Sequence, residues 1–128
     1  MTPSTNFATE LTMLKRILRH ARPNVLIVGS WRWIEAVRQT LTPLLALPIC
    51  LCLLPGPLTL ARGHGGTLLV EDVAALRLDQ QADLLQWLNK DHRVQVISAT
   101  STPLFPLVRT GTFDETLYYR LNVLTIDE

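Results

Sequence analysis

Lysine is scarce in this chain of 128 residues, which has only Lys15 and Lys90 among its 12 basic residues. Charged residues of all kinds make up 18% of the sequence, below the roughly 25% of an average soluble domain. The net charge of +1 leaves no basic surplus, so we predict no direct binding to DNA. Any mechanism that requires a lysine is restricted to two positions.

Cysteine is limited to Cys50 and Cys52, which stand two residues apart. Such a pair makes no disulfide framework, and the sequence has no second cluster of cysteine and histidine to complete a zinc site. A redox-active pair is the alternative. The apolar residues on either side favour two buried thiols that pack as small hydrophobic side chains. We therefore predict no metal site.

The segment from Gln39 to Ala61 has no charged residue and is long enough to span a bilayer. Four prolines interrupt it: Pro43, Pro48, Pro55 and Pro57. Proline removes a backbone donor from a helix, and the longest apolar run without one, Ile49–Leu54, has the length of a fully buried parallel strand. The N-terminus also has no basic start followed by an apolar run. We expect a cytoplasmic protein without a membrane segment.

Short apolar runs alternate with helix-like segments along the chain. The expected strands are Val25–Val28, Ile49–Leu54, Thr67–Val70, Val94–Ala99 and Val123–Ile126. The expected helices are Phe7–Ala21, Ile34–Leu41, Leu78–Leu88, Phe105–Val108 and Asp114–Leu121. A glycine-rich loop that contains His64 precedes the third strand. This alternation predicts a single α/β domain over residues 1–128, with a parallel five-stranded sheet and helices on both faces in three layers.

Two acidic residues, Glu71 and Asp72, follow the third expected strand. Ligands of open α/β sheets bind at the carboxyl ends of the strands. One carboxylate there can hold Mg²⁺ through water, and the next can orient an attacking water. Alone, such a pair is more often a solvated strand end, because parallel strands commonly end on polar groups.

Four blocks of sequence around this pair follow a known pattern in order and spacing. They are Gly65–Val73, Leu78–Leu88, Val96–Thr100 and Phe113–Val123, the last of which contains L-Y-Y-R-L-N-V. Together they resemble the ATPase domain of bacterial sigma-54-dependent transcriptional activators, a branch of the AAA+ family. The resemblance implies a P-loop NTPase-like core and a role in transcription regulation.

The sequence departs from the family pattern where the resemblance places the phosphate loop. Such loops cradle phosphates with the N–H groups of several glycines and add a lysine. Here the segment reads Gly29-Ser30-Trp31-Arg32-Trp33, with one glycine and no lysine. Arg32 is the candidate for the place of the lysine. We predict that Trp31 and Trp33 pack the second helix against the sheet.

The resemblance puts Glu71 at the metal-binding position and Asp72 at the catalytic one, which inverts the family's order of Asp and Glu. Because aspartate is one methylene shorter, the attacking water would shift by about an ångström, which can cost on the order of 10²-fold in rate. Thr100 matches a sensing threonine, and Ser101 replaces the usual asparagine. We assign no catalytic residue. The residues regarded as vestigial nucleotide-binding positions are Gly29, Ser30, Arg32, Glu71, Asp72 and Thr100.

In the family, two arginines reach the nucleotide of the neighbouring subunit. Asp114 replaces the first, and Arg120 keeps the second. Between Pro55 and Gly66 nothing resembles the family's G-A-F-T-G-A loop, so no sigma-factor contact is expected. The sequence stops at the fifth strand, so neither the lid nor a helix-turn-helix is expected. We predict a truncated, degenerate and non-hydrolysing domain without a cofactor, which associates with an intact AAA+ activator or with itself. The alternative is an ATP- or ADP-binding regulator, or a weak ATPase that uses Mg²⁺.

Overall fold

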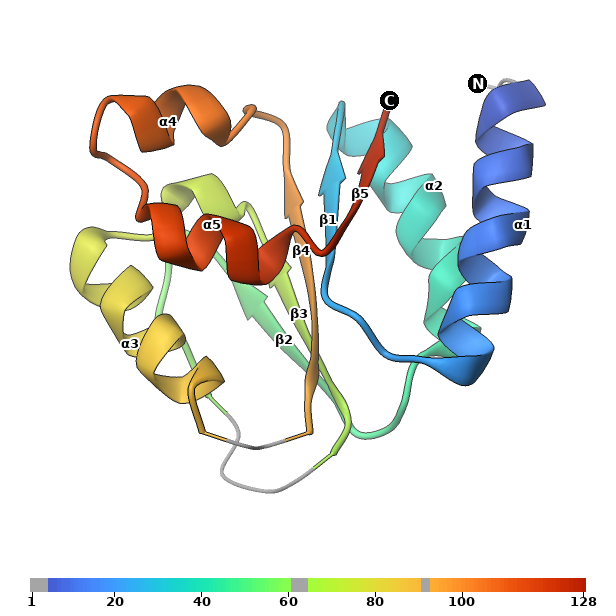
Figure 1. Ribbon diagram of the computed structural model, residues 1–128, viewed down its shortest axis with the longest axis horizontal. Helices are drawn as coiled ribbons and strands as arrows, with labels where there is room; N and C mark the ends of the chain where they lie inside the picture. Colours follow the sequence, from blue (N-terminus) through green and yellow to red (C-terminus); the bar gives the residue numbers. More distant parts are fainter. Residues whose placement is uncertain (1–4, 61–64, 91–92) are drawn as a thin grey trace.

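The computed structural model of the chain describes residues 5–60, 65–90 and 93–128. Five parallel strands form one sheet in the order β2-β3-β4-β1-β5 (Figure 1). The strands are β1 (Val25–Val28), β2 (Ile49–Leu53), β3 (Thr67–Glu71), β4 (Gln95–Thr100) and β5 (Leu124–Asp127). The helices are α1 (Thr5–His20), α2 (Trp31–Leu41), α3 (Leu78–Leu88), α4 (Phe105–Arg109) and α5 (Glu115–Leu121). The α/β prediction is confirmed, while His64 lies outside the described residues.

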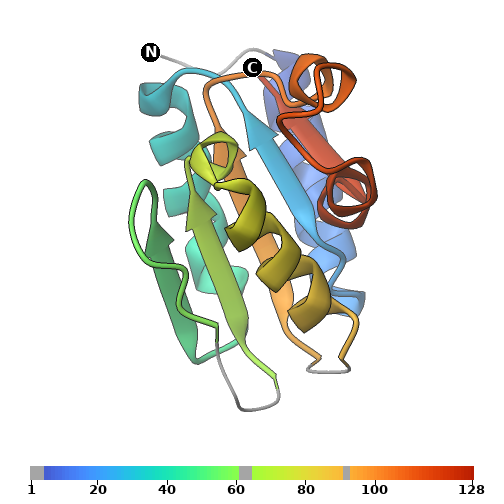
Figure 2. The ribbon, with the colours of Figure 1, turned by 90° about the vertical axis from the view of Figure 1, so that its left-hand side faces the viewer.

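Helices cover both faces of the sheet. Successive side chains of each strand point to opposite faces, so the apolar strands present side chains on both faces that the helices bury. Val25 and Ile27 of β1 belong to the core on the side of α1 and α2. Leu26, between them, belongs to the core on the side of α3, α4 and α5. Figures 1 and 2 show these two helical layers with the sheet between them. The predicted three-layer arrangement is therefore confirmed.

Helix α2 begins at Trp31, three residues before the predicted Ile34. Ser30 is its N-cap, and the Ser30 hydroxyl oxygen accepts a hydrogen bond from the Trp33 N–H at 3.3 Å. A serine cap satisfies one of the free N–H groups of the first turn. The connection between β1 and α2 is therefore only Gly29 and Ser30.

Strand β2 lies at the edge of the sheet, so the prediction of a fully buried strand is wrong. Leu51 and Leu53 are 46% and 58% exposed. A continuous apolar run indicates a parallel strand but does not tell a central strand from an edge strand.

Cys52 is buried, and burial raises the pKa of its thiol, whereas Cys50 is half-buried. Both cysteines are free thiols.

The connection from β2 to β3 has no helix in its described parts, residues 54–60 and 65–66. Its side chains Leu58 and Leu60 pack into the core on the α3 side. The Thr59 carbonyl accepts a hydrogen bond from the Cys52 thiol, with 3.3 Å between sulfur and oxygen. This segment therefore lies over the α3 face of β2.

No helix in the described part of the chain is long and apolar enough to cross a membrane.

Candidate functional site

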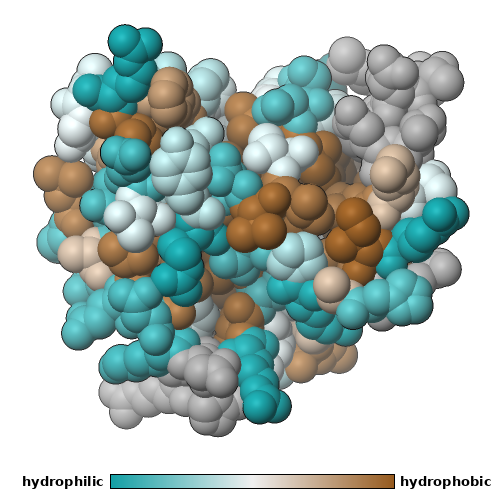
Figure 3. Space-filling model, viewed as in Figure 1, coloured by the Kyte–Doolittle hydropathy of each residue, from teal (hydrophilic) through white to brown (hydrophobic). Residues whose placement is uncertain are grey.

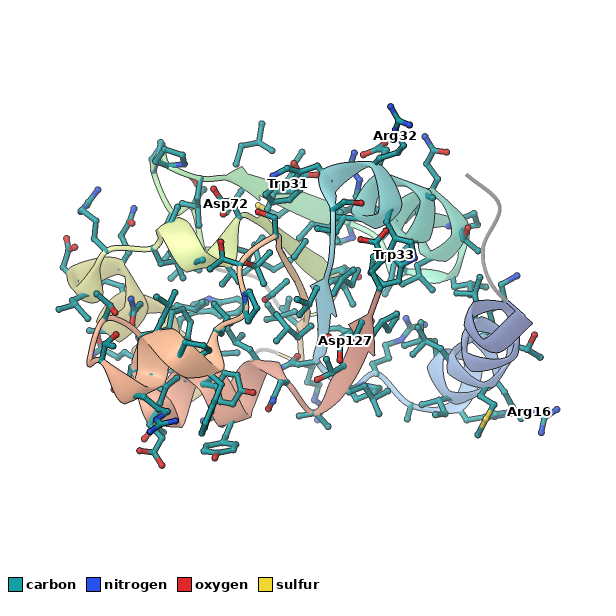
Figure 4. All side chains as sticks on the ribbon, turned by 90° about the horizontal axis from the view of Figure 1, so that it is seen from above. Arg16, Trp31, Arg32, Trp33, Asp72 and Asp127 are labelled. Atoms are coloured by element: carbon teal, nitrogen blue, oxygen red, sulfur yellow. The ribbon has the colours of Figure 1, made fainter. Side chains whose placement is uncertain are left out.

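The carboxyl ends of three neighbouring strands bring most of the predicted site residues together. Gly29 and Ser30 follow β1, Thr100 ends β4, and Glu71 and Asp72 lie at the end of β3. The Gly29 N–H donates to the Thr100 carbonyl at 3.1 Å. Figure 4 looks down on this edge of the sheet. Arg32 and Arg120 lie elsewhere, as described below.

Gly29 stands where no larger residue fits. A Cβ atom at this position would lie 2.6 Å from Cε3 of Trp33 and 2.7 Å from Cβ of Glu128. Both distances are shorter than atoms tolerate without movement of a neighbour. The turn from β1 into α2 is thus packed between a tryptophan and a glutamate, with no free space beside the Gly29 backbone.

The Glu128 carboxylate binds the turn at the N-terminus of α2. Its Oε1 atom accepts a hydrogen bond from the Ser30 N–H at 2.7 Å, and its Oε2 atom accepts one from the Ser30 hydroxyl at 3.2 Å. The N-terminus of a helix favours negative charge, because its first N–H groups and its dipole are positive. A carboxylate of the chain itself therefore lies where helix N-termini hold anions. Glu128 is not among the predicted site residues, although a polar residue directly after a strand beside β1 is a usable signal.

Glu71 is engaged by an arginine of α2. Arg38 forms ion pairs with Glu71 through Nη1 and with Glu35 through Nη2. The side chains of Arg38 and Glu71 are each 27% exposed, so this pair is only partly screened by water. Arg38 was not predicted, because nothing in its local sequence marks a contact with the end of β3.

Asp72 has a left-handed backbone conformation, with φ at 61°, directly after β3. Its half-buried carboxylate has no hydrogen bond or ion pair with the described residues. Thr100 is fully buried, and its hydroxyl accepts from the Thr102 N–H at 2.9 Å and donates to the Thr102 carbonyl at 2.7 Å. The Thr100 hydroxyl thus stabilises its own turn, whereas Asp72 keeps a free carboxylate at this edge.

Arg32 points away from the strand ends into solvent, whereas Trp31 points toward the side of the strand ends (Figure 4). Trp33 is buried in the core on the α1 and α2 side, which confirms its predicted packing role. The same prediction is wrong for Trp31, which is 45% exposed. Trp31 is the first residue of α2, and its side chain projects beyond the sheet rather than onto it.

Arg120 and Asp114 have structural partners on the other side of the domain. The Arg120 guanidinium donates to Oδ1 of Asn89 at 2.6 Å and to the Leu88 carbonyl at 2.8 Å. A cation at the C-terminus of α3 is favourable, because the last carbonyls and the dipole there are negative. The Asp114 carboxylate caps α5 by accepting from the Leu117 N–H at 2.8 Å. Within the described residues, no group of three or more metal-ligating side chains is present.

Residues 53–127 match the family described as the Sigma-54 interaction domain. The chain belongs to this family. Over 78 residues it is 40% identical to the HTH-type transcriptional regulatory protein TyrR of Salmonella typhimurium, a match that covers 52% of this chain and 15% of TyrR. The match therefore spans about a seventh of the length of this relative.

Solved structures show the same fold. NtrX from Brucella abortus, in complex with ADP, superposes with a TM-score of 0.76 at 19% identity, covering 99% of this chain and 36% of NtrX. The P-loop NTPase domain of the sigma-54 transport activator from E. coli gives a TM-score of 0.66 at 18% identity, and each chain is covered to 97%. The chain therefore combines the sequence of the Sigma-54 interaction domain family with an AAA+ P-loop NTPase-like fold.

Proposed function

We propose that this domain regulates transcription by associating with other proteins and does not hydrolyse ATP. The observation that carries the proposal is the Glu128 carboxylate on the Ser30 N–H, at the turn where the family pattern has its phosphate loop. A phosphate group needs free backbone N–H groups and a nearby cation. In this chain the N–H is already bonded, and the negative charge of Glu128 would repel a phosphate.

The neighbouring groups fit a nucleotide with Mg²⁺ equally poorly. The connection of Gly29 and Ser30 is too short to wrap a phosphate, and a Cβ added at Gly29 would already clash. Glu71, at the metal-binding position of the family pattern, is paired with Arg38. The two lysines lie in α1 and just after α3. Because these residues do not fit ATP with Mg²⁺, the proposal includes no hydrolysis of ATP.

Mixing the domain with an intact sigma-54 activator tests the proposed association. We expect the ring formation or the ATPase rate of the activator to change with increasing concentration of the domain, while the domain alone releases no phosphate from ATP. An intact activator without the domain is the control. An unchanged activator across the whole concentration series, or phosphate release by the domain alone, would contradict the proposal.

The second candidate is an ATP- or ADP-binding regulator or a weak ATPase. The free Asp72 carboxylate at the end of β3 favours it, as does the fold shared with NtrX, which has been solved with ADP and with ATP. Under this alternative, Asp72→Asn would abolish a measurable phosphate release, while Asp79→Asn, an exposed carboxylate of α3, would leave it unchanged. Either function requires the domain to be in the cytoplasm with the transcription machinery.

A further inference from the structure

The outer edge of β2 carries backbone groups without partners among the described residues. On its inner side β2 pairs with β3, and the Leu54 N–H donates to the Glu71 carbonyl at 3.2 Å. Because backbone groups of successive strand residues point to opposite sides, Ile49, Leu51 and Leu53 direct their N–H and C=O groups outward. Figure 2 shows β2 in green at the border of the sheet, with the segment that follows it folded back beside the strand.

Within the described residues, this edge lacks the usual protection against pairing with another chain. Natural edge strands are commonly blocked by charged side chains, bulges or a covering element. No charged residue occurs between Gln39 and Ala61. Pro48 and Pro55 limit the open strand to the residues between them and do not block it, because they lie beyond its ends. Leu51 and Leu53 add two exposed apolar side chains on the face that Ile49 shares.

The sequence of β2 is almost symmetric about its centre. It reads Ile-Cys-Leu-Cys-Leu, so a second copy running antiparallel presents nearly the same side chains in the same order. With the two Leu51 residues opposite each other, Ile49 faces Leu53 of the second copy, and Cys50 faces Cys52 of the second copy. In this register the outward groups form hydrogen-bonded pairs, and the cysteines fall in the closer, non-hydrogen-bonded pairs. Such a self-complementary contact is what a two-fold dimer requires.

We propose that two copies of this chain associate through their β2 strands, antiparallel and with Leu51 on the two-fold axis. The two sheets then form one continuous sheet, and the exposed leucines of each copy cover those of the other. The proposal makes a second copy of the chain one partner of the association proposed above. The dimer contact does not depend on whether nucleotide binds. The dimer proposal and the proposed non-hydrolysing function can therefore fail separately.

The other edge of the sheet provides the comparison. Figure 3 shows apolar side chains gathered between α5 and α1, on the side where β5 is the edge strand. Val123, which precedes β5, is 58% exposed. Strand β5 itself, however, exposes Thr125 and Asp127. A charged side chain on an edge strand disfavours pairing, so we assign the dimer contact to β2.

Light scattering on the full chain tests the contact. We expect a mass of about twice 14.4 kDa for the unchanged chain and 14.4 kDa for Leu51→Lys, because two lysines would meet on the axis. Val123→Lys, the matched control at the other edge, should remain a dimer. Circular dichroism should show that both variants keep the fold, since both positions are exposed. A monomeric unchanged chain, a dimer of unchanged mass in Leu51→Lys, or loss of the dimer only in Val123→Lys would overturn the proposal.

Cross-linking tests the register independently. In a Cys50→Ser, Cys52→Ser background, Leu51→Cys should form a disulfide-linked dimer on mild oxidation, because two Cα atoms in such a pair lie about 5.5 Å apart. Leu53→Cys in the same background should remain unlinked, because its counterpart in the second copy is offset along the strand by about 13 Å. Equal cross-linking of the two variants, or linkage of Leu53→Cys alone, would contradict the proposed axis.

Discussion

Glu128 lies 98 residues from Ser30 in the sequence, yet its side chain accepts two hydrogen bonds from that serine. Arg38 and Glu71 likewise come from different elements. The strand-end rule predicted a ligand-binding edge for Glu71 and Asp72, and the family resemblance assigned Gly29, Ser30 and Thr100 to the same site. Sequence reasoning could not pair these residues with their partners, because the partners are fixed by the packing of elements that are distant in sequence.

Glu128→Gln tests the electrostatic part of the Ser30 contact. The amide oxygen can still accept a hydrogen bond, but the negative charge at the N-terminus of α2 is lost. We expect the free energy of unfolding to fall by about 0.5–1 kcal/mol at low salt, and by less at high salt, because salt screens the dipole. Urea denaturation gives this quantity. Asp127→Asn, the neighbouring exposed carboxylate, is the control, and an equal effect of the two variants would show that the contact with Ser30 contributes nothing.

Comparison of the predicted and observed helices and strands shows which structural features can be predicted from the sequence. The apolar runs predicted all five strands, but both β2 at the edge and the buried β3 appear as continuous apolar runs. Position within the sheet depends on topology, which a run of apolar residues does not encode. The start of α2 was missed because Trp31 and Arg32 precede its apolar periodicity, and the cap at Ser30 was the available signal.

Gln81 joins α3 to the segment that precedes it and to the turn before α5, and so provides a test at the scale of the element. Its side-chain amide donates to the Leu76 carbonyl at 3.0 Å and to the Thr112 carbonyl at 2.9 Å, and it accepts from the Asp114 N–H at 2.7 Å. Gln81 is 1% exposed, so its loss would leave buried polar groups without partners. We expect Gln81→Met to lower the free energy of unfolding by about 3 kcal/mol.

Gln86→Met, on the exposed side of the same helix, serves as the control and should change the free energy of unfolding by less than about 0.5 kcal/mol. Chemical denaturation of both variants makes the comparison. Similar small losses in the two would mean that α3 is not tied through Gln81 to the turn before α5.

At the scale of the whole molecule, the domain keeps the sheet order and the layers of an AAA+ core. The difference from the family pattern that bears most directly on nucleotide binding lies at the turn between β1 and α2. The resemblance predicted this difference from a missing lysine and missing glycines. The structure adds a carboxylate at the same turn, bound to the backbone. The central claim of the proposed function is that this chain keeps the fold without a working nucleotide site.

Calorimetric titration of the domain with ATP and with ADP, each with Mg²⁺ up to millimolar concentration, tests that claim most directly. An intact sigma-54 activator titrated alongside serves as the positive control. We predict no saturable heat for the domain and, in parallel, no rise in its melting temperature. A ligand present at 100 times its Kd would stabilise the fold by about 2.7 kcal/mol, an effect readily seen as a thermal shift. Saturable binding of one nucleotide per chain would contradict the account.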